Sequence, residues 1–220
     1  MIPASAPPSH VSARLDQPDD PAGWRGVQGA AYAQRNPSDP EHLDWMYTQH
    51  YGITRTALNE RFLQRVPRHA GLVEVGCGNG VQIRLLRRMG FSDVVGFDLN
   101  HPAVAESGGG LFVANAQHIP LRSKSRDMAY TSGTLMHIPP PDRAQFCAEL
   151  VRISRRWIWG LELWSESGRT WTYGGLIPTS WSRAEPATWL ELYPSFRLVD
   201  QARIQHKETT YVMYLLDMDG

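Results

Sequence analysis

The residues with the clearest chemical potential lie between Leu72 and Gly80, where the chain reads LVEVGCGNG. An apolar run there breaks into Gly76, Gly78 and Gly80, and Asp98 follows about 20 residues later. Glycines let the backbone turn sharply beside a ligand, and the next helix offers free N–H groups. An acid at that distance can accept hydrogen bonds from both hydroxyls of a ribose. These features predict a nucleotide-binding turn. We expect Leu99, which follows Asp98, to contact the nucleotide as well.

The glycine spacing distinguishes between nucleotides. A dinucleotide fingerprint, G-x-G-x-x-G counted from Gly76, requires a glycine at position 81, where the chain has Val81. The pattern is instead E-x-G-x-G-x-G, with Glu74 inside the expected strand. A nicotinamide dehydrogenase is therefore disfavoured. Three alternatives remain open: a glycine turn without a ligand, Asp98 as a helix N-cap, and Glu74 as a buried acid satisfied by backbone N–H groups.

Three further polar residues follow expected strands. Ser132 ends one strand at the carboxyl edge, where ligands bind in α/β sheets. His137 lies one turn further and could take a proton from a hydroxyl or amine, or be a structural residue of that turn. Glu162 interrupts an apolar strand, where a carboxylate is costly unless it is used or paired. We expect His137 and Glu162 at the catalytic site.

Aromatic residues cluster late in the chain. Six of the eight tryptophans fall between Trp157 and Trp189. Aromatic faces suit sugar rings, flat heterocycles or a sulfonium cation, so we expect Trp164, Trp171 and Tyr173 to contact substrate. The alternative is that they form a small satellite core.

The elements that must position these residues follow from hydrophobic spacing. Helical spacing runs from His42 to Val66 with a break near Gly52, and short helices are expected over 81–89, 102–106 and 142–153. A capping box of Ser182 and Glu185 predicts a helix through Tyr193. Strands are expected over 72–75, 94–97, 111–114, 127–131 and 157–163, followed by a terminal hairpin of 196–204 and 209–216. The order predicts an α/β fold with an antiparallel last strand.

Composition bounds the function. The chain has 220 residues, with 22 basic and 22 acidic side chains, so a whole-protein basic field for nucleic acid is absent. Its two cysteines make neither a disulfide framework nor a metal cluster, which suits a reducing cytoplasm. We expect no signal peptide, no membrane span and no metal. Three regions are predicted: a flexible tail at 1–22, a helical cap at 23–67 that acts as a lid, and a core at 68–220.

E-x-G-x-G-x-G followed by Asp98 resembles motif I of class I S-adenosylmethionine-dependent methyltransferases, which have a Rossmann-like seven-stranded sheet. More specifically, the region around Trp24, the segment Tyr32-x-x-Arg35-Asn36, the turn at 135–138 and Glu162-x-Trp164 resemble methylases associated with pseudaminic acid biosynthesis.

The resemblance implies S-adenosylmethionine as the cofactor. It implies that Glu74 orders the methionine amine, that Asn115 and Ala116 contact adenine, and that Tyr32 and Arg35 close over the methionine carboxylate. Asn115 stands where many relatives carry Asp, so a plain turn residue is the alternative. Tyr32 could instead pack and Arg35 lie on the surface. Ser132 is expected on the cofactor side.

The resemblance favours methyl transfer to an O or N atom of a small molecule, a specialised metabolite or sugar derivative, by a monomer or homodimer that engages no nucleic acid or membrane. Two alternatives remain: an RNA or protein methyltransferase, and a non-catalytic S-adenosylmethionine-binding scaffold.

Overall fold

The computed structural model describes residues 24, 36–100, 104, 111–172 and 178–219. The expected tail at 1–22 lies outside these residues, as do Tyr32, Arg35, Tyr173 and all of the expected helix at 102–106 except Val104.

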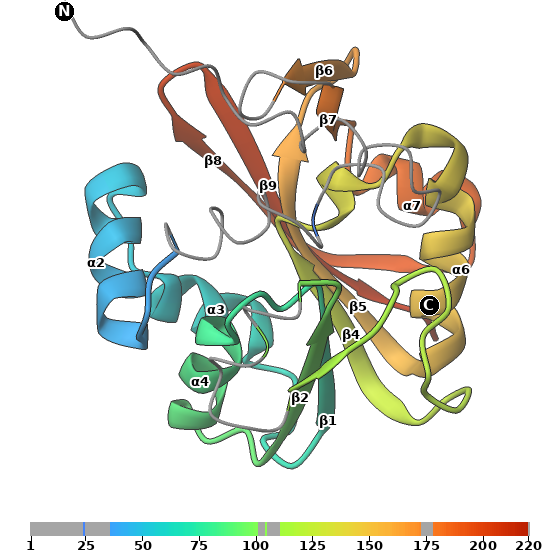
Figure 1. Ribbon diagram of the computed structural model, residues 1–220, viewed down its shortest axis with the longest axis horizontal. Helices are drawn as coiled ribbons and strands as arrows, with labels where there is room; N and C mark the ends of the chain where they lie inside the picture. Colours follow the sequence, from blue (N-terminus) through green and yellow to red (C-terminus); the bar gives the residue numbers. More distant parts are fainter. Residues whose placement is uncertain (1–23, 25–35, 101–103, 105–110, 173–177, 220) are drawn as a thin grey trace, which may run out of the picture.

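A seven-stranded sheet forms the centre of the molecule (Figure 1). Its strand order is β3-β2-β1-β4-β5-β9-β8, and β9 runs antiparallel to both neighbours. The parallel strands are β1 (Gly71–Val75), β2 (Asp93–Asp98), β3 (Leu111–Val113), β4 (Arg126–Ser132) and β5 (Ser154–Trp164), and the terminal hairpin comprises β8 (Arg197–His206) and β9 (Thr209–Asp217). The predicted sheet and its reversed last strand are confirmed.

Helices cover both faces of the sheet (Figure 1). One face carries α2 (Pro40–Tyr51), α3 (Arg55–Leu63) and α4 (Val81–Arg88), and the other carries α6 (Arg143–Ile153) and α7 (Ala187–Leu192). Each face has its own apolar core, one including Phe62 and Trp159 and the other Phe146 and Trp189. The strands between them are buried on both sides, which explains their nearly continuous apolar runs.

The break between α2 and α3 lies where the sequence predicts it. Gly52 ends α2 in the left-handed conformation, with φ of 70°, and its N–H donates to the carbonyl of Thr48. Asp39 caps α2, and the Thr54 side chain accepts from the N–H of Ala57 to cap α3. Local chemistry therefore sets these helix boundaries.

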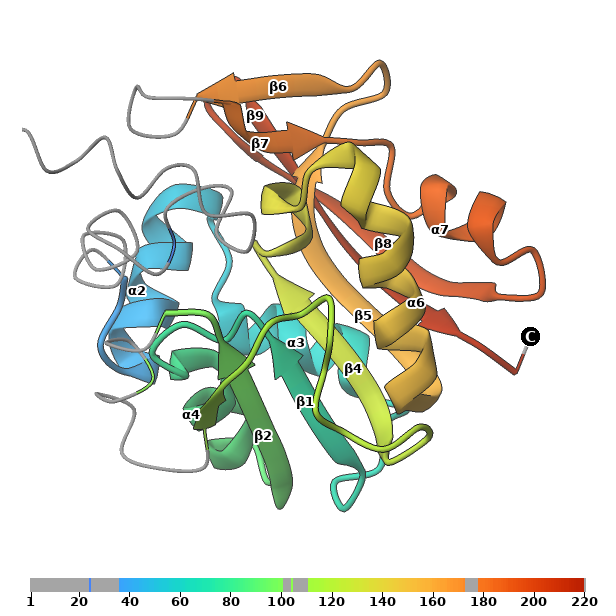
Figure 2. The ribbon, with the colours of Figure 1, turned by 45° about the vertical axis from the view of Figure 1, so that its right-hand side comes forward.

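The segment after β5 differs from expectation. Its described parts form a two-stranded sheet of β6 (Arg169–Thr172) and β7 (Pro178–Ser182) at the end of β5 (Figure 2). The predicted capping box is wrong: Ser182 lies in β7, where its hydroxyl accepts from the N–H of Arg169, and α7 begins after Pro186. Glu185 instead faces a buried arginine of α6.

Two short 3-10 helices, η2 (Leu135–His137) and η3 (Pro140–Asp142), connect β4 to α6. Among the described residues, no helix combines the length and apolar character needed to cross a bilayer. Likewise, no group of three or more His, Cys, Asp or Glu side chains in the described part could hold a metal ion.

Candidate functional site

The glycine turn after β1 has the backbone that its sequence predicts. Gly76, Gly78 and Gly80 have φ of 76°, 53° and 73°, all in the left-handed region. A Cβ on Gly76 would overlap the Thr134 side chain, whereas one on Gly78 would meet only the Asn36 amide, at 4.0 Å. The turn thus packs closely against the chain at Gly76 and leaves space beside Gly78.

Asp98 ends β2 next to this turn. Its carboxylate accepts hydrogen bonds from the backbone N–H of Gly78, at 2.8 Å, and of Asn100, at 2.7 Å. Burial raises the pKa of Asp98, and these N–H groups oppose the shift. The carboxylate therefore both fixes the turn and lines the cavity in front of it.

Glu74 lies on the buried side of β1. Its carboxyl group is 3% exposed and accepts from the hydroxyl of Tyr130, at 3.2 Å. Burial raises the pKa of Glu74 to about 8, although the charge of Arg55 lowers it. Burial therefore favours the protonated form of Glu74.

These residues line one cavity of about 310 Å³. One end is formed by the glycine turn and the residues after β2 and β3, and it includes the expected Leu99, Asn115 and Ala116. Ser132 lies at the junction with the turn after β4. The structure therefore brings the described residues expected to contact the nucleotide together at this cavity, except Gly80, which is the N-cap of α4 and packs against Leu111.

The other end of the cavity is walled by apolar and aromatic side chains. They come from α2, β5 and the β8–β9 hairpin: Leu43, Met46, Tyr47, Tyr51, Leu161, Ile204 and Tyr211. Trp24 and Met136 complete the lining on the side of η2. Such a surface suits a ligand with an apolar or flat body. The four-residue spacing of Leu43, Tyr47 and Tyr51 on α2 is the signal that sequence reasoning missed here.

His137 lies at the edge of this cavity and is 9% exposed. Its Nδ1 is 3.1 Å from the hydroxyl of Ser180, which β7 carries. The imidazole also contacts the Trp24 ring edge to face, with 4.6 Å between centroids. Ser180 therefore orients a histidine that faces the ligand space, a contact that sequence spacing did not reveal.

Glu162 does not reach the cavity, contrary to expectation. Its buried carboxyl group accepts from the backbone N–H of Thr134, at 3.2 Å, and of Met136, at 3.0 Å. The carboxylate that interrupts β5 is thus satisfied by the turn that contains His137, and its role is to position that turn.

The aromatic residues expected at the substrate site lie elsewhere or are undescribed. Trp164 is absent from the cavity lining, and the guanidinium of Arg203 stacks over its ring at 3.7 Å. Trp171 lies in β6, and the structure describes only its backbone. Tyr173 lies outside the described residues. The aromatic wall that is observed comes instead from α2 and β9.

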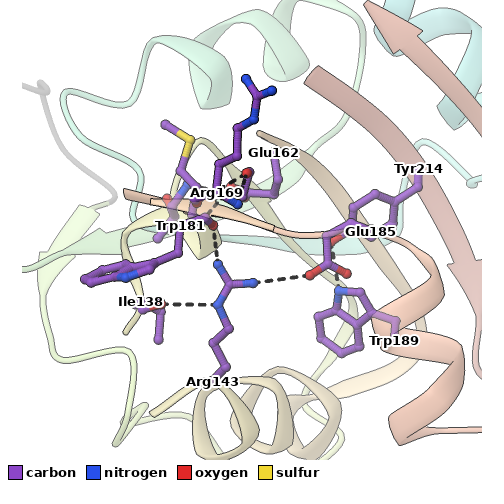
Figure 3. A network of polar contacts seen from close by, with 11 residues as sticks. Ile138, Arg143, Glu162, Arg169, Trp181, Glu185, Trp189 and Tyr214 are labelled. Carbon is purple, nitrogen blue, oxygen red and sulfur yellow. Dashed lines mark hydrogen bonds and ion pairs between the residues drawn. The ribbon is translucent and has the colours of Figure 1, made fainter. Parts of the chain in front are cut away.

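A buried polar cluster supports the η2–β7 side of the site (Figure 3). The Arg143 guanidinium donates to the carbonyls of Ile138 and Trp181 and pairs with Glu185 at 3.4 Å. Burial raises the pKa of Glu185 to about 7, and the charge of Arg143 opposes that shift. The cluster ties α6 to the strand that carries Ser180.

Comparison with known families agrees with this geometry. The family model described as "Methyltransferase domain" matches residues 73–156, from β1 into β5. Residues 73–156 are therefore similar to a methyltransferase domain. The matched region includes the glycine turn, Asp98 and His137.

Relatives extend the comparison. Over 111 aligned residues, the chain is 30% identical to a tRNA (carboxymethyluridine(34)-5-O)-methyltransferase of Arabidopsis thaliana, and the match covers 47% of this chain and 27% of that protein. A Pyrococcus horikoshii protein of solved structure has a TM-score of 0.64 at 13% identity, over 85% of this chain and 98% of that one. The Burkholderia thailandensis 1,6-didemethyltoxoflavin-N1-methyltransferase, solved with its substrate and S-adenosylhomocysteine, has a TM-score of 0.58 at 17% identity, over 74% and 75%. The chain therefore has the Rossmann-like fold of class I methyltransferases.

Proposed function

We propose that the chain transfers a methyl group from S-adenosylmethionine to an O or N atom of a small molecule, a specialised metabolite or sugar derivative. The observation that carries this proposal is the single cavity that joins the glycine turn and Asp98 to an apolar, aromatic end. The first end suits a nucleoside and the second a compact acceptor. The resemblance of Glu162-x-Trp164 and the region around Trp24 to pseudaminic acid-associated methylases favours a sugar derivative.

The residues present fit S-adenosylmethionine. Asp98 would accept from the ribose hydroxyls, Leu99, Asn115 and Ala116 would contact adenine, and Glu74 would lie near the methionine amine. The open space beside Gly78 admits a ligand against the backbone. We keep Tyr32 and Arg35 as candidates for the methionine carboxylate. When bound, the cofactor supplies an electrophilic methyl group.

The protein's task is then to position the acceptor and exclude water. His137 would remove the proton from the attacking hydroxyl or amine, with its ring oriented through Nδ1 by Ser180. Glu162 would hold the His137 turn through the N–H groups of Thr134 and Met136. The residues therefore divide into ligand-contacting groups and the groups that position them.

A two-stage experiment tests the proposal. Calorimetry should show binding of S-adenosylhomocysteine and none of nicotinamide dinucleotides. Radiolabelled S-adenosylmethionine is then incubated with a small-molecule extract, with total RNA and with protein. Label in the small-molecule fraction supports the proposal. Tight NAD binding without S-adenosylhomocysteine binding contradicts it, and cofactor binding without any transfer favours a scaffold role.

A tRNA acceptor is the second candidate, because the Arabidopsis thaliana relative acts on tRNA. RNA binding of the usual electrostatic kind predicts steep salt dependence. The equal numbers of acidic and basic residues give little reason to expect it. Label in the RNA fraction would establish this alternative.

A further inference from the structure

Arg55 is a buried cation in the cavity wall. It lies in the first turn of α3 and is 1% exposed. Its Nη1 donates to the hydroxyl of Tyr47, at 2.8 Å, and its Nε donates to the side-chain oxygen of Asn59, at 3.1 Å. Its Nη2 is buried and has no hydrogen-bond partner among the described residues. A donor of this kind is costly to bury unless a ligand satisfies it.

The positive charge of Arg55 also lacks a close counter-charge. Among the described residues, no carboxylate lies within ion-pair distance of its guanidinium. Glu74 interacts with it electrostatically, but burial raises the pKa of Glu74 and so favours its neutral form. The rings of Tyr47 and Trp159, 5.3 and 5.4 Å away, provide only a weaker cation–π contact.

Gln82 adds an unsatisfied acceptor to the same wall. Its Nε2 donates to the side-chain oxygen of Asn59, at 3.2 Å, so Asn59 accepts from both Arg55 and Gln82. The Gln82 side-chain oxygen is buried and has no hydrogen-bond partner in the part of the chain that the structure describes. Arg55 and Gln82 both line the cavity. Together they offer a charged donor and a neutral acceptor to one ligand.

We propose that Arg55 binds a carboxylate of a molecule held in this cavity, with Tyr47 and Asn59 fixing the guanidinium. A guanidinium is suited to a carboxylate because its N–H groups match the spacing of the two oxygens. Two sources provide this chemistry: the methionine carboxylate of the cofactor and a carboxylate on the acceptor. The inference rests on the proposed function for the presence of these ligands.

Calorimetry on three proteins distinguishes the sources. The wild-type chain and Arg55→Met are titrated with S-adenosylhomocysteine and with 5′-methylthioadenosine, which lacks the amino-acid part. The matched control is Arg61→Met, since Arg61 lies on the same helix, is half exposed and pairs with Asp200. Each S-adenosylhomocysteine complex is then titrated with aromatic carboxylates and with the corresponding amides.

If the cofactor supplies the carboxylate, Arg55→Met lowers the affinity for S-adenosylhomocysteine about 10- to 100-fold. The affinity for 5′-methylthioadenosine stays within about twofold of wild type. If the acceptor supplies it, S-adenosylhomocysteine affinity is unchanged, and wild type prefers the carboxylates over their amides while Arg55→Met loses that preference. Arg61→Met behaves as wild type in both cases. Equal weakening of both nucleosides, or no change in any titration, overturns the inference.

If Arg55→Met does not fold, Tyr47→Phe serves as the second variant, because it removes one hydrogen bond from the guanidinium. Tyr47→Phe should lower the affinity for the same carboxylate ligand by a smaller factor. An unaltered carboxylate preference in this variant overturns the inference. Absence of S-adenosylhomocysteine binding to the wild-type chain would instead overturn the proposed function. The two failures are therefore distinguishable.

Discussion

Two buried arginines on opposite faces of the sheet differ in how their charge is satisfied. Arg143 on α6 donates to two backbone carbonyls and pairs with Glu185. Within the described residues, Arg55 on α3 donates only to the neutral side chains of Tyr47 and Asn59, and its Nη2 has no partner. Arg143 joins segments of the protein to one another, whereas Arg55 lines a cavity. A buried charge with complete partners indicates architecture, and one with incomplete partners beside a cavity indicates a ligand.

The largest effect is expected for Arg143→Met. Removing the guanidinium leaves Glu185 and two carbonyls without their donor, so the free energy of unfolding should fall by about 4 kcal/mol. Urea denaturation measures it. Arg126→Met, at an ion pair with the exposed Asp93, is the control and should cost under about 1 kcal/mol. Similar losses in both variants would show that Arg143 is not a structural centre.

On the Arg55 side, a pH effect on stability is expected from Glu74. Burial raises the pKa of Glu74 to about 8 from 4.5, so between these values the folded chain holds a proton that the unfolded chain has released. Stability from this group therefore falls as pH rises from 5 to 8, by about 3 kcal/mol. Urea denaturation at both pH values should show a smaller decrease in Glu74→Gln than in wild type. Equal decreases would contradict the assignment.

Asp98→Ala should weaken S-adenosylhomocysteine by about 2 kcal/mol, because a charge-assisted hydrogen bond to the ribose is lost. Calorimetry measures the affinity, and a melting curve shows whether the turn at Gly78 also loosens. Asp98→Asn keeps one acceptor oxygen, so its affinity for S-adenosylhomocysteine should lie between those of wild type and Asp98→Ala. Unchanged affinity in Asp98→Ala would place the nucleoside elsewhere.

The smallest effect is expected for Ser180→Ala. Loss of the contact to His137 Nδ1 should lower turnover by about fivefold, or about 1 kcal/mol, and shift the acidic limb of the pH–rate profile. The affinity for S-adenosylhomocysteine should stay within about twofold. Ser182→Ala is the matched control. Ser182 lies on the same strand, and its hydroxyl forms hydrogen bonds with the backbone of Arg169. A changed rate with an unshifted profile would mean that Ser180 does not act through His137.

The sequence alone determines the sheet, the glycine turn and the position of Asp98. Each follows from short-range rules: apolar runs make buried strands, glycines allow positive φ, and parallel strands bring their carboxyl ends to one edge. The break at Gly52 and the terminal hairpin follow from the same local chemistry. The strands, the turn and the break can each be recognised from residues close in the chain, although the sheet itself pairs distant strands such as β1 and β4.

Only the tertiary structure decides which polar side chains face the cavity. Glu162 is predicted at the catalytic site, yet its carboxyl group turns to the N–H groups of Thr134 and Met136. Ser180 reaches His137 across 43 positions, and Gln82 meets Asn59 across 23. Glu185 pairs with Arg143 although its spacing predicts a helix cap. Buried polar groups take whichever partner the fold brings within hydrogen-bond distance, and that partner comes from distant parts of the chain.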